Sequence, residues 1–220
     1  MSFLKKLIQR DKVPLEKVHP GAYRFLVVGC GRSGTHFLAK FLQLNGLDIG
    51  HEATGKAGAV AWLLAAEDVR RQREVTFEKT AHIIRSPVTA LRSLQTMTRG
   101  SWDYVFRYLP QCRHSDPFVA SARYWVWWNR LSREQASLSV RLEDFEEDGQ
   151  KTAAKLSEFF ELPLDPSLIA AARESGDSRR SHSNYGRPVE PSYIMEKDPD
   201  TYREMKILGE SFSYRLDESA

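Results

Sequence analysis

Apolar residues recur along the chain in two patterns, short runs and longer stretches with a helical period. The clearest run, Phe25-Leu26-Val27-Val28, predicts a buried strand. Other runs predict strands at 47–49, 77–84 and 137–142. Helical spacing predicts helices over 34–45, 59–73, 88–97, 118–134, 148–160, 166–174 and 199–209, with short helix and loop over 98–117. Strands that alternate with helices indicate an α/β fold of three layers around a central parallel sheet.

The pattern indicates a single domain over residues 1–220, because 220 residues suit one α/β unit and no internal boundary interrupts them. Residues 1–20 form an N-terminal segment with a few apolar side chains, which we expect to dock on the domain. Segment 175–191 is rich in Ser, Gly, Arg and Pro and has almost no apolar residues, which is typical of a loop. Because a helix follows it, we expect this loop to be ordered, or to be ordered by a ligand when it closes over a cofactor.

A glycine-bearing turn joins the first strand to the first helix, with the sequence Gly29-Cys30-Gly31-Arg32-Ser33-Gly34-Thr35. Glycines let backbone approach an anion closely, and the first N–H groups of a helix have no partner within the helix. Arg32, Ser33 and Thr35 add one cation and two hydroxyls. The turn therefore predicts a cradle for a phosphate-like group, with a plain helix entry as the alternative.

The cradle departs from the loop that binds ATP in P-loop enzymes. That loop follows G-x-x-x-x-G-K-[ST], and Gly29 and Gly34 have its spacing. The lysine position is occupied by Thr35 and the next position by His36, so the cation lies inside the loop, at Arg32. This weakens the hypothesis of a small-molecule kinase, which also requires an acidic residue at a strand end that Glu143 or Asp144 would match only loosely.

A second candidate anion site begins where the strand at 77–84 ends. Arg85 follows this strand, Pro87 opens the next helix, and Ser93 lies about two helical turns further along. Ligands of open α/β sheets bind at the carboxyl ends of the strands, where a guanidinium and a hydroxyl can hold a phosphate together.

These segments resemble sulfotransferases that use 3′-phosphoadenosine 5′-phosphosulfate (PAPS). The form G-x-x-R-S-G-T is similar to their 5′-phosphosulfate loop. The arginine, proline and serine of the second segment resemble their 3′-phosphate segment, with Ser86 in place of the usual Asp or Asn. The pair Tyr124-Trp125 and the later VRLEDF resemble a third region, and the order of all three agrees over about half of the chain. The resemblance implies a P-loop NTPase-like sulfotransferase fold, with PAPS as co-substrate and no metal.

The resemblance also implies roles for individual residues. Arg32 would stabilise the leaving 5′-phosphate, and Glu52 or His51, with Glu52 favoured, would be the base that accepts the acceptor's proton. A strand-end pair with backbone bonds is the alternative for these two. The co-substrate would be bound by Gly31, Arg32, Ser33, Gly34, Thr35, His36, Arg85, Ser93 and, from the late loop, Arg187. That loop also contains Arg179, Arg180 and Tyr185, and a solvated basic loop is an equal alternative.

Composition and charge exclude several kinds of partner, site and cellular location. A net charge of +3 is too small to suggest a nucleic-acid partner and is compatible with an anionic co-substrate. Two cysteines, Cys30 and Cys112, without C-x-x-C spacing argue against a zinc site or disulfide scaffold. Without an apolar run of 18 residues or a signal-peptide pattern at residues 1–20, we expect a cytoplasmic protein without stable membrane insertion. The pattern defines no oligomeric state.

The sequence therefore favours a sulfotransferase that transfers a sulfuryl group from PAPS to a hydroxyl or amine. We expect the acceptor to be a saccharide or another small molecule, held by aromatic and basic side chains between residues 100 and 113. A non-catalytic nucleotide binder of the same fold is one alternative, and a P-loop kinase is the other. His82, on a buried strand, is expected to be a core histidine, and Arg141, Glu143 and Asp144 are expected to form structural pairs.

Overall fold

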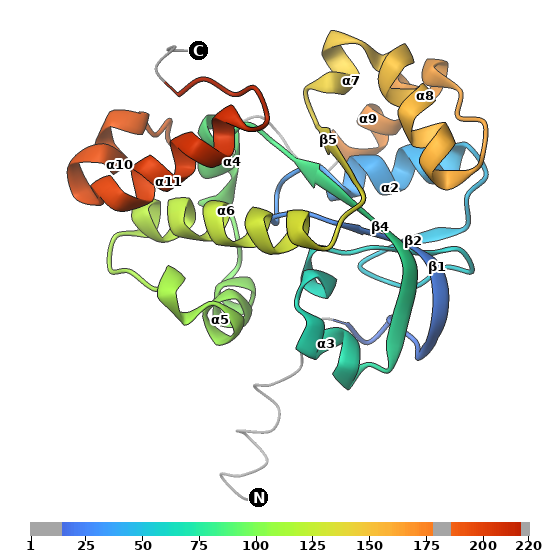
Figure 1. Ribbon diagram of the computed structural model, residues 1–220, viewed down its shortest axis with the longest axis horizontal. Coiled ribbons are helices and arrows are strands. Elements are labelled where there is room, and N and C mark those ends of the chain that lie inside the picture. The colour runs from blue at the N-terminus through green and yellow to red at the C-terminus, as the bar shows by residue number, and fades with distance from the viewer. Residues whose placement is uncertain (1–14, 178–185, 217–220) are drawn as a thin grey trace, which may run out of the picture.

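The computed structural model of the protein describes residues 15–177 and 186–216. Within these ranges five parallel strands form one sheet, in the order β2-β3-β1-β4-β5 (Figure 1). The strands are β1 (Gly21–Val28), β2 (Ile49–His51), β3 (Gly58–Val60), β4 (Val75–Ile84) and β5 (Leu138–Arg141). The sequence prediction of an α/β fold around a parallel sheet is confirmed.

Strand β1 is the centre of the sheet. Its Val27 pairs with Val60 of β3 on one side and with Ala81 of β4 on the other, and Ile83 of β4 pairs with Val140 of β5. Since all strands run in one direction, their carboxyl ends meet at one edge. The segments that follow the strands, including the turn after β1, are therefore brought together there.

Two hydrophobic cores lie on the two faces of this sheet. Alternate residues of β1 enter different cores, because successive side chains of a strand point to opposite faces. Leu26 and Val28 pack in the core that contains Trp125, while Phe25 and Val27 pack in the core that contains Phe41. The sheet between two helical layers gives the three layers that the sequence predicts.

Helices cover both faces (Figure 1). The core on the Phe41 side is closed by α2 (Thr35–Leu44), α7 (Asp144–Glu147), α8 (Gly149–Phe160), η4 (Pro166–Leu168) and α9 (Ile169–Asp177). The core on the Trp125 side is closed by η2 (Trp62–Ala65), α3 (Glu67–Gln72), α4 (Pro87–Leu94), α5 (Arg99–Tyr108), η3 (Pro110–Cys112), α6 (Pro117–Glu134), α10 (Pro191–Lys197) and α11 (Pro199–Glu210).

The structure departs from the predicted elements in three places. The single helix predicted over 59–73 is wrong: the segment contains the end of β3, the 3₁₀ turn η2 and the short helix α3. A three-residue strand that is buried throughout has the same apolar character as the start of a buried helix, so the pattern could not separate them. Two short helices were not predicted, α7 at Asp144–Glu147 and α10 at Pro191–Lys197.

In the two described ranges, no helix combines the length and the apolar composition needed to cross a membrane. Both cysteines are free and buried. Burial raises the pKa of the Cys30 thiol to about 12, and it does the same for the Cys112 thiol.

Candidate functional site

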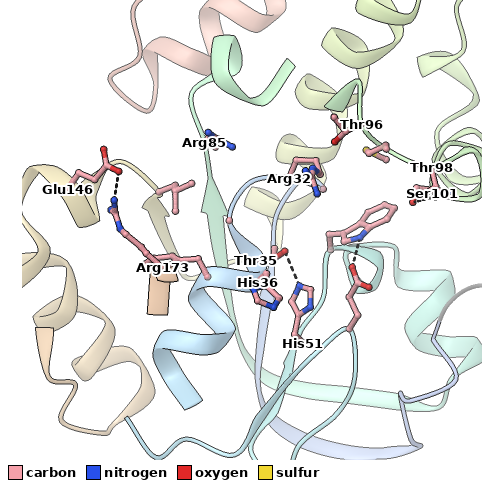
Figure 2. A pocket seen from close by; sticks show the side chains of 17 residues that line it. Arg32, Thr35, His36, His51, Arg85, Thr96, Thr98, Ser101, Glu146 and Arg173 are labelled. Atoms are coloured by element: carbon pink, nitrogen blue, oxygen red, sulfur yellow. Dashed lines mark hydrogen bonds and ion pairs between the residues drawn. The ribbon is translucent and has the colours of Figure 1, made fainter. Parts of the chain in front are cut away.

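A cavity of about 400 Å³ opens at the edge where the strands end (Figure 2). Side chains from the segments after all five strands, and from α9, meet around it. The lining residues are Gly31, Arg32, Gly34, Thr35, His36, Phe37, His51, Glu52, Trp62, Arg85, Thr96, Met97, Thr98, Ser101, Leu142, Glu146 and Arg173. The two segments predicted to bind anions therefore share one cavity.

The turn after β1 has the backbone geometry of an anion cradle. Gly34 caps α2 in the left-handed region, with φ at 93°, and Arg32 is also left-handed, with φ at 73°. The first helical bond runs from Leu38 N to Gly34 O. The N–H groups of the first three helical residues therefore precede the hydrogen-bonded ladder of the helix, where an anion can be bound.

Glycine suits position 34 because of its backbone conformation and its close packing. Its φ favours glycine, and a Cβ there would lie 2.7 Å from Leu142 Cδ1. The turn thus packs directly against the segment that follows β5.

The structure places the predicted loop residues differently around the cavity. Arg32, Gly34, Thr35 and His36 line it. Ser33 does not: its side chain is fully buried, and its N–H donates to Cys30 O at 3.1 Å. Among the described residues its hydroxyl has no hydrogen-bond partner. The Ser33 hydroxyl is therefore buried outside the cavity lining, and its anion-binding role stays a prediction.

Gly31 lines the cavity, but its N–H already has a protein partner. It donates to the hydroxyl of Tyr124 at 2.7 Å, and Tyr124 is a fully buried residue of α6. Burial raises the pKa of this phenol well above its usual value, so it stays protonated. Gly31 therefore contributes the shape of the cradle, while its donor fixes the loop to α6.

The two predicted phosphate sites are hydrogen-bonded to each other. Arg32 Nε donates to Ser93 Oγ at 3.0 Å. Ser93 is almost fully buried on α4, and Arg85 lines the cavity from the end of β4. Arg32, Arg85 and Ser93 are thus brought together as the sequence predicts.

His51 and Glu52 also lie in the cavity, at the end of β2. His51 Nε2 lies 3.4 Å from Thr35 Oγ1, and its ring packs edge-to-face against His36 at 5.0 Å between ring centroids (Figure 2). The carboxylate of Glu52 accepts a hydrogen bond from Trp62 Nε1 at 3.1 Å. Both candidate bases are therefore next to the anion loop.

The residues expected to form structural pairs do so. Arg141 is ion-paired with Asp144 at 2.6 Å. Glu143 accepts from Ser86 N at 3.0 Å and from the Tyr214 hydroxyl at 2.7 Å, which fixes the turn after Arg85. These acids support the site from outside the cavity lining.

His82 is a core histidine, as predicted. It is fully buried, and its two ring nitrogens contact Asn129 Oδ1 at 3.0 Å and Ser139 Oγ at 3.3 Å. Because an amide oxygen only accepts, Nε2 of His82 carries the proton. Burial lowers the pKa of His82 to about 4, so the ring is neutral.

Arg187 lies near the site but outside the cavity lining. Its backbone N–H donates to Gln95 Oε1 at 3.1 Å, and its guanidinium lies 5.6 Å from the centre of the Phe118 ring. Gly186 packs so closely that a Cβ there would lie 2.6 Å from Arg92 O. The end of the late loop is therefore docked on α4, while Arg179, Arg180 and Tyr185 lie outside the described residues.

Several lining residues escaped the sequence reasoning. Arg173 of α9 is ion-paired with Glu146, and its guanidinium lies 5.6 Å from the centre of the Phe37 ring. Trp62 follows β3, the strand that was mistaken for a helix. Aromatic and basic side chains between residues 100 and 113 were expected to hold the acceptor, but from this segment the cavity lining contains Ser101. Thr96, Met97 and Thr98, which precede the segment, also line the cavity.

Charge is distributed unevenly around the cavity. Figure 2 shows Arg85 and the Glu146–Arg173 pair on one side of Arg32, and the hydroxyls of Thr96, Thr98 and Ser101 on the other. The first side suits an anion, while the second offers uncharged hydrogen-bonding groups. Among residues 15–177 and 186–216, no group of three or more His, Cys, Asp or Glu side chains is arranged to hold a metal ion.

No family model matches the chain, and no curated protein matches its sequence. Among solved structures, the chain is similar to mouse sulfotransferase SULT7A1 complexed with PAP. The TM-score is 0.45 and the sequence identity 18%, over 80% of this chain and 71% of that chain. At this distance the similarity assigns no function to the chain.

Proposed function

We propose that the protein is a PAPS-dependent sulfotransferase. The observation that carries the proposal is the shared cavity of the two anion segments, joined by the hydrogen bond between Arg32 Nε and Ser93 Oγ at 3.0 Å. A ligand with anionic groups at two separate positions matches this arrangement better than a triphosphate does. In support, the lysine position of an ATP-binding loop is occupied by Thr35.

The proposed reaction moves a sulfuryl group in line from a phosphate oxygen to the acceptor atom. The acceptor oxygen or nitrogen forms the new bond to sulfur while the S–O bond to the 5′-phosphate breaks, and 3′,5′-adenosine bisphosphate (PAP) leaves. Arg32 balances the charge that develops on the leaving phosphate and does not act as a proton donor, because a guanidinium stays protonated near neutral pH. The donors at the start of α2 would hold the same phosphate.

Glu52 is the favoured base in this reaction. It would accept the proton of the acceptor hydroxyl or amine as the new bond forms. Trp62 holds one of its carboxylate oxygens at 3.1 Å, so the side chain is oriented at the cavity wall. His51 contacts the Thr35 hydroxyl, which suits a role in arranging the start of α2.

The acceptor side favours an uncharged molecule with several hydroxyl groups. Thr96, Thr98 and Ser101 present hydroxyls to the cavity, and Glu52 would repel a second carboxylate. Thr98 and Ser101 bond each other at 3.1 Å, so their remaining hydrogen-bonding positions are pre-arranged. A saccharide or a small alcohol fits this chemistry, and an amine would also be attracted by Glu52.

A transfer assay with ³⁵S-labelled PAPS tests the proposal. The panel contains neutral sugars, uronic acids, small alcohols, amines and phenols, and the matched control is Arg32→Ala. We expect labelled product from a neutral sugar, alcohol or amine, and strongly reduced product from the variant. Binding of PAP without transfer to any acceptor would indicate a non-catalytic binder, and binding of ATP with Mg²⁺ but not of PAP would indicate a kinase. Either result would overturn the proposal.

A further inference from the structure

Four aromatic side chains form a compact cluster next to the cavity. Trp62 is the central member, with ring centroids 5.3 Å from Tyr104, 6.2 Å from Tyr124 and 5.5 Å from Trp128, all edge-to-face. All four residues are buried. Rings packed in this way have little freedom to move independently.

Two members of this cluster are hydrogen-bonded to Glu52 and to the anion loop, and the other two are hydrogen-bonded to the backbone of η2. Trp62 Nε1 donates to Glu52 Oε1 at 3.1 Å, and the Tyr124 hydroxyl accepts from Gly31 N at 2.7 Å. In contrast, the Tyr104 hydroxyl donates to Leu63 O and Trp128 Nε1 donates to Trp62 O. The proposed base and the anion loop are therefore each hydrogen-bonded to one side of the same aromatic unit.

The loop also packs directly on this unit. A Cβ at Gly31 would lie 3.1 Å from the Tyr124 hydroxyl and 3.7 Å from Trp62 Cδ2. A glycine at position 31 thus lets the loop backbone reach both rings. This contact and the two hydrogen bonds are separate observations that place the same rings between the loop and Glu52.

Glu52 is held by its backbone as well as by its side chain. Its φ is 50°, in the left-handed region that few residues other than glycine adopt, and its N–H donates to Val60 O at 3.0 Å. Trp62 then fixes the carboxylate, at Oε1. Among the described residues, this indole bond is the hydrogen bond that the carboxylate makes, which leaves Oε2 for a ligand.

We propose that Trp62 and Tyr124 are positioning residues that fix the distance between Glu52 and the anion loop. The proposal rests on the proposed sulfuryl transfer, with Glu52 as the base. In-line transfer requires the base, the acceptor oxygen and the donor to keep a set geometry, and small displacements are costly. Trp62 fixes the position of the Glu52 carboxylate, and Tyr124 fixes the position of the loop backbone at Gly31.

Three matched substitutions separate these roles. Trp62→Phe and Tyr124→Phe each keep a ring and remove one polar contact to Glu52 or to the anion loop, while Tyr104→Phe removes a hydroxyl that bonds the backbone of Leu63. We expect Trp62→Phe to lower kcat by roughly tenfold or more with the affinity for PAP changed less than about twofold, as loss of a bond to a charged group predicts. We expect Tyr124→Phe to weaken PAP binding by roughly fivefold. Tyr104→Phe should change neither quantity.

Turnover is measured as PAP release from PAPS, with the best acceptor of the panel or with water, and PAP affinity by calorimetry. Wild-type kcat in Trp62→Phe would overturn the role of Trp62, and wild-type PAP affinity in Tyr124→Phe would overturn that of Tyr124. If Tyr104→Phe lowered kcat and PAP affinity as much as the other two variants do, the proposal would also be overturned. Such a result would show that the losses come from disturbed packing of the aromatic cluster.

A spectroscopic measurement tests the Trp62 contact without activity. The indole N–H signal of Trp62, assigned by its loss in Trp62→Phe, is followed by ¹H–¹⁵N NMR. The chemical shift of this signal should change in Glu52→Ala, which removes the hydrogen-bond acceptor. It should change little in Glu52→Gln, which keeps a carbonyl oxygen. An unchanged signal in Glu52→Ala would refute the contact. Failure of PAP to bind wild-type protein would instead refute the proposed function.

Discussion

Arg32 donates through Nε to Ser93 Oγ at 3.0 Å, although 61 residues separate them in the chain. Arg32 belongs to the turn between β1 and α2, and Ser93 to α4. Each was predicted to hold a different phosphate. Because this hydrogen bond links the two phosphate positions, an anion that binds Arg32 can alter the hydrogen bonding of Ser93, and the reverse. We therefore expect a substitution at one position to change the affinity for an anion at the other.

Replacing Ser93 by Ala should weaken PAP binding by about tenfold, because it removes the acceptor that orients Arg32 and a hydroxyl that we propose to contact the 3′-phosphate. Calorimetric titration with PAP measures the effect. Ser132→Ala is the matched control: this buried serine of α6 has no hydrogen-bond partner within the described part of the chain, so PAP affinity should be unchanged. Equal affinities for wild type and Ser93→Ala would contradict the link.

Replacing Arg85 by Ala should distinguish the binding contribution of the 3′-phosphate position from that of the 5′-phosphate position. If Arg85 binds the 3′-phosphate, the variant should lose about 10- to 100-fold in affinity for PAP, as expected for a lost charged hydrogen bond. Its affinity for adenosine 5′-phosphate, which lacks that group, should change little. Arg71→Ala, an exposed arginine on α3, controls for the change in net charge. Parallel losses for both nucleotides would show that Arg85 does not distinguish the 3′-phosphate.

Glu52→Gln keeps an oxygen for Trp62 but removes the proton acceptor. Turnover of PAPS should fall by roughly 100-fold or more while PAP affinity stays within about twofold, since general-base catalysis contributes at this scale. His51→Gln should instead alter PAP affinity through its contact with Thr35. The reverse outcome, in which His51→Gln abolishes turnover and Glu52→Gln does not, would assign the base to His51.

His82 should make the protein less stable in mild acid. Burial lowers the pKa of its ring from about 6.5 to about 4 in the folded protein. Between these values the unfolded chain binds more protons, so the free energy of unfolding falls as pH falls. From pH 7.5 to pH 5.0 the expected loss is about 2 kcal/mol.

Urea unfolding at these two pH values, compared between wild type and His82→Gln, measures this contribution. The variant keeps a polar side chain for Asn129 and cannot titrate, so it should lose less stability on acidification. Acidification also changes the protonation of carboxylates, but this effect is common to both proteins. The difference between their losses of unfolding free energy therefore gives the contribution of His82. Equal losses would show that His82 is not held neutral.

The sequence predicts those parts of the site whose anion-binding residues lie in a single turn directly after a strand. Arg32, Gly34 and Thr35 lie in one such turn, and Arg85 in another. Because the strands are parallel, their order along the chain was enough to place these segments at one edge. The helical position of Ser93 relative to Arg85 was also local in sequence, so its location could be anticipated.

The contacts that support the site could not be predicted in this way. Tyr124 bonds Gly31 across 93 residues, and nothing in its helix distinguishes a buried tyrosine that holds a loop from one that fills the core. Trp62 was missed because the strand before it resembles the start of a helix. The burial of Ser33 depends on backbone angles that the pattern does not contain.

Calorimetric titration of the wild-type protein with PAP, without Mg²⁺, tests the central claim most directly. The account predicts one PAP per chain, binding that is weakened at least tenfold in Arg32→Ala and in Arg85→Ala, and much weaker binding of ATP with Mg²⁺. Circular dichroism should show that both variants remain folded. Absence of PAP binding to the wild-type protein, or unchanged PAP affinity in both arginine variants, would contradict the account.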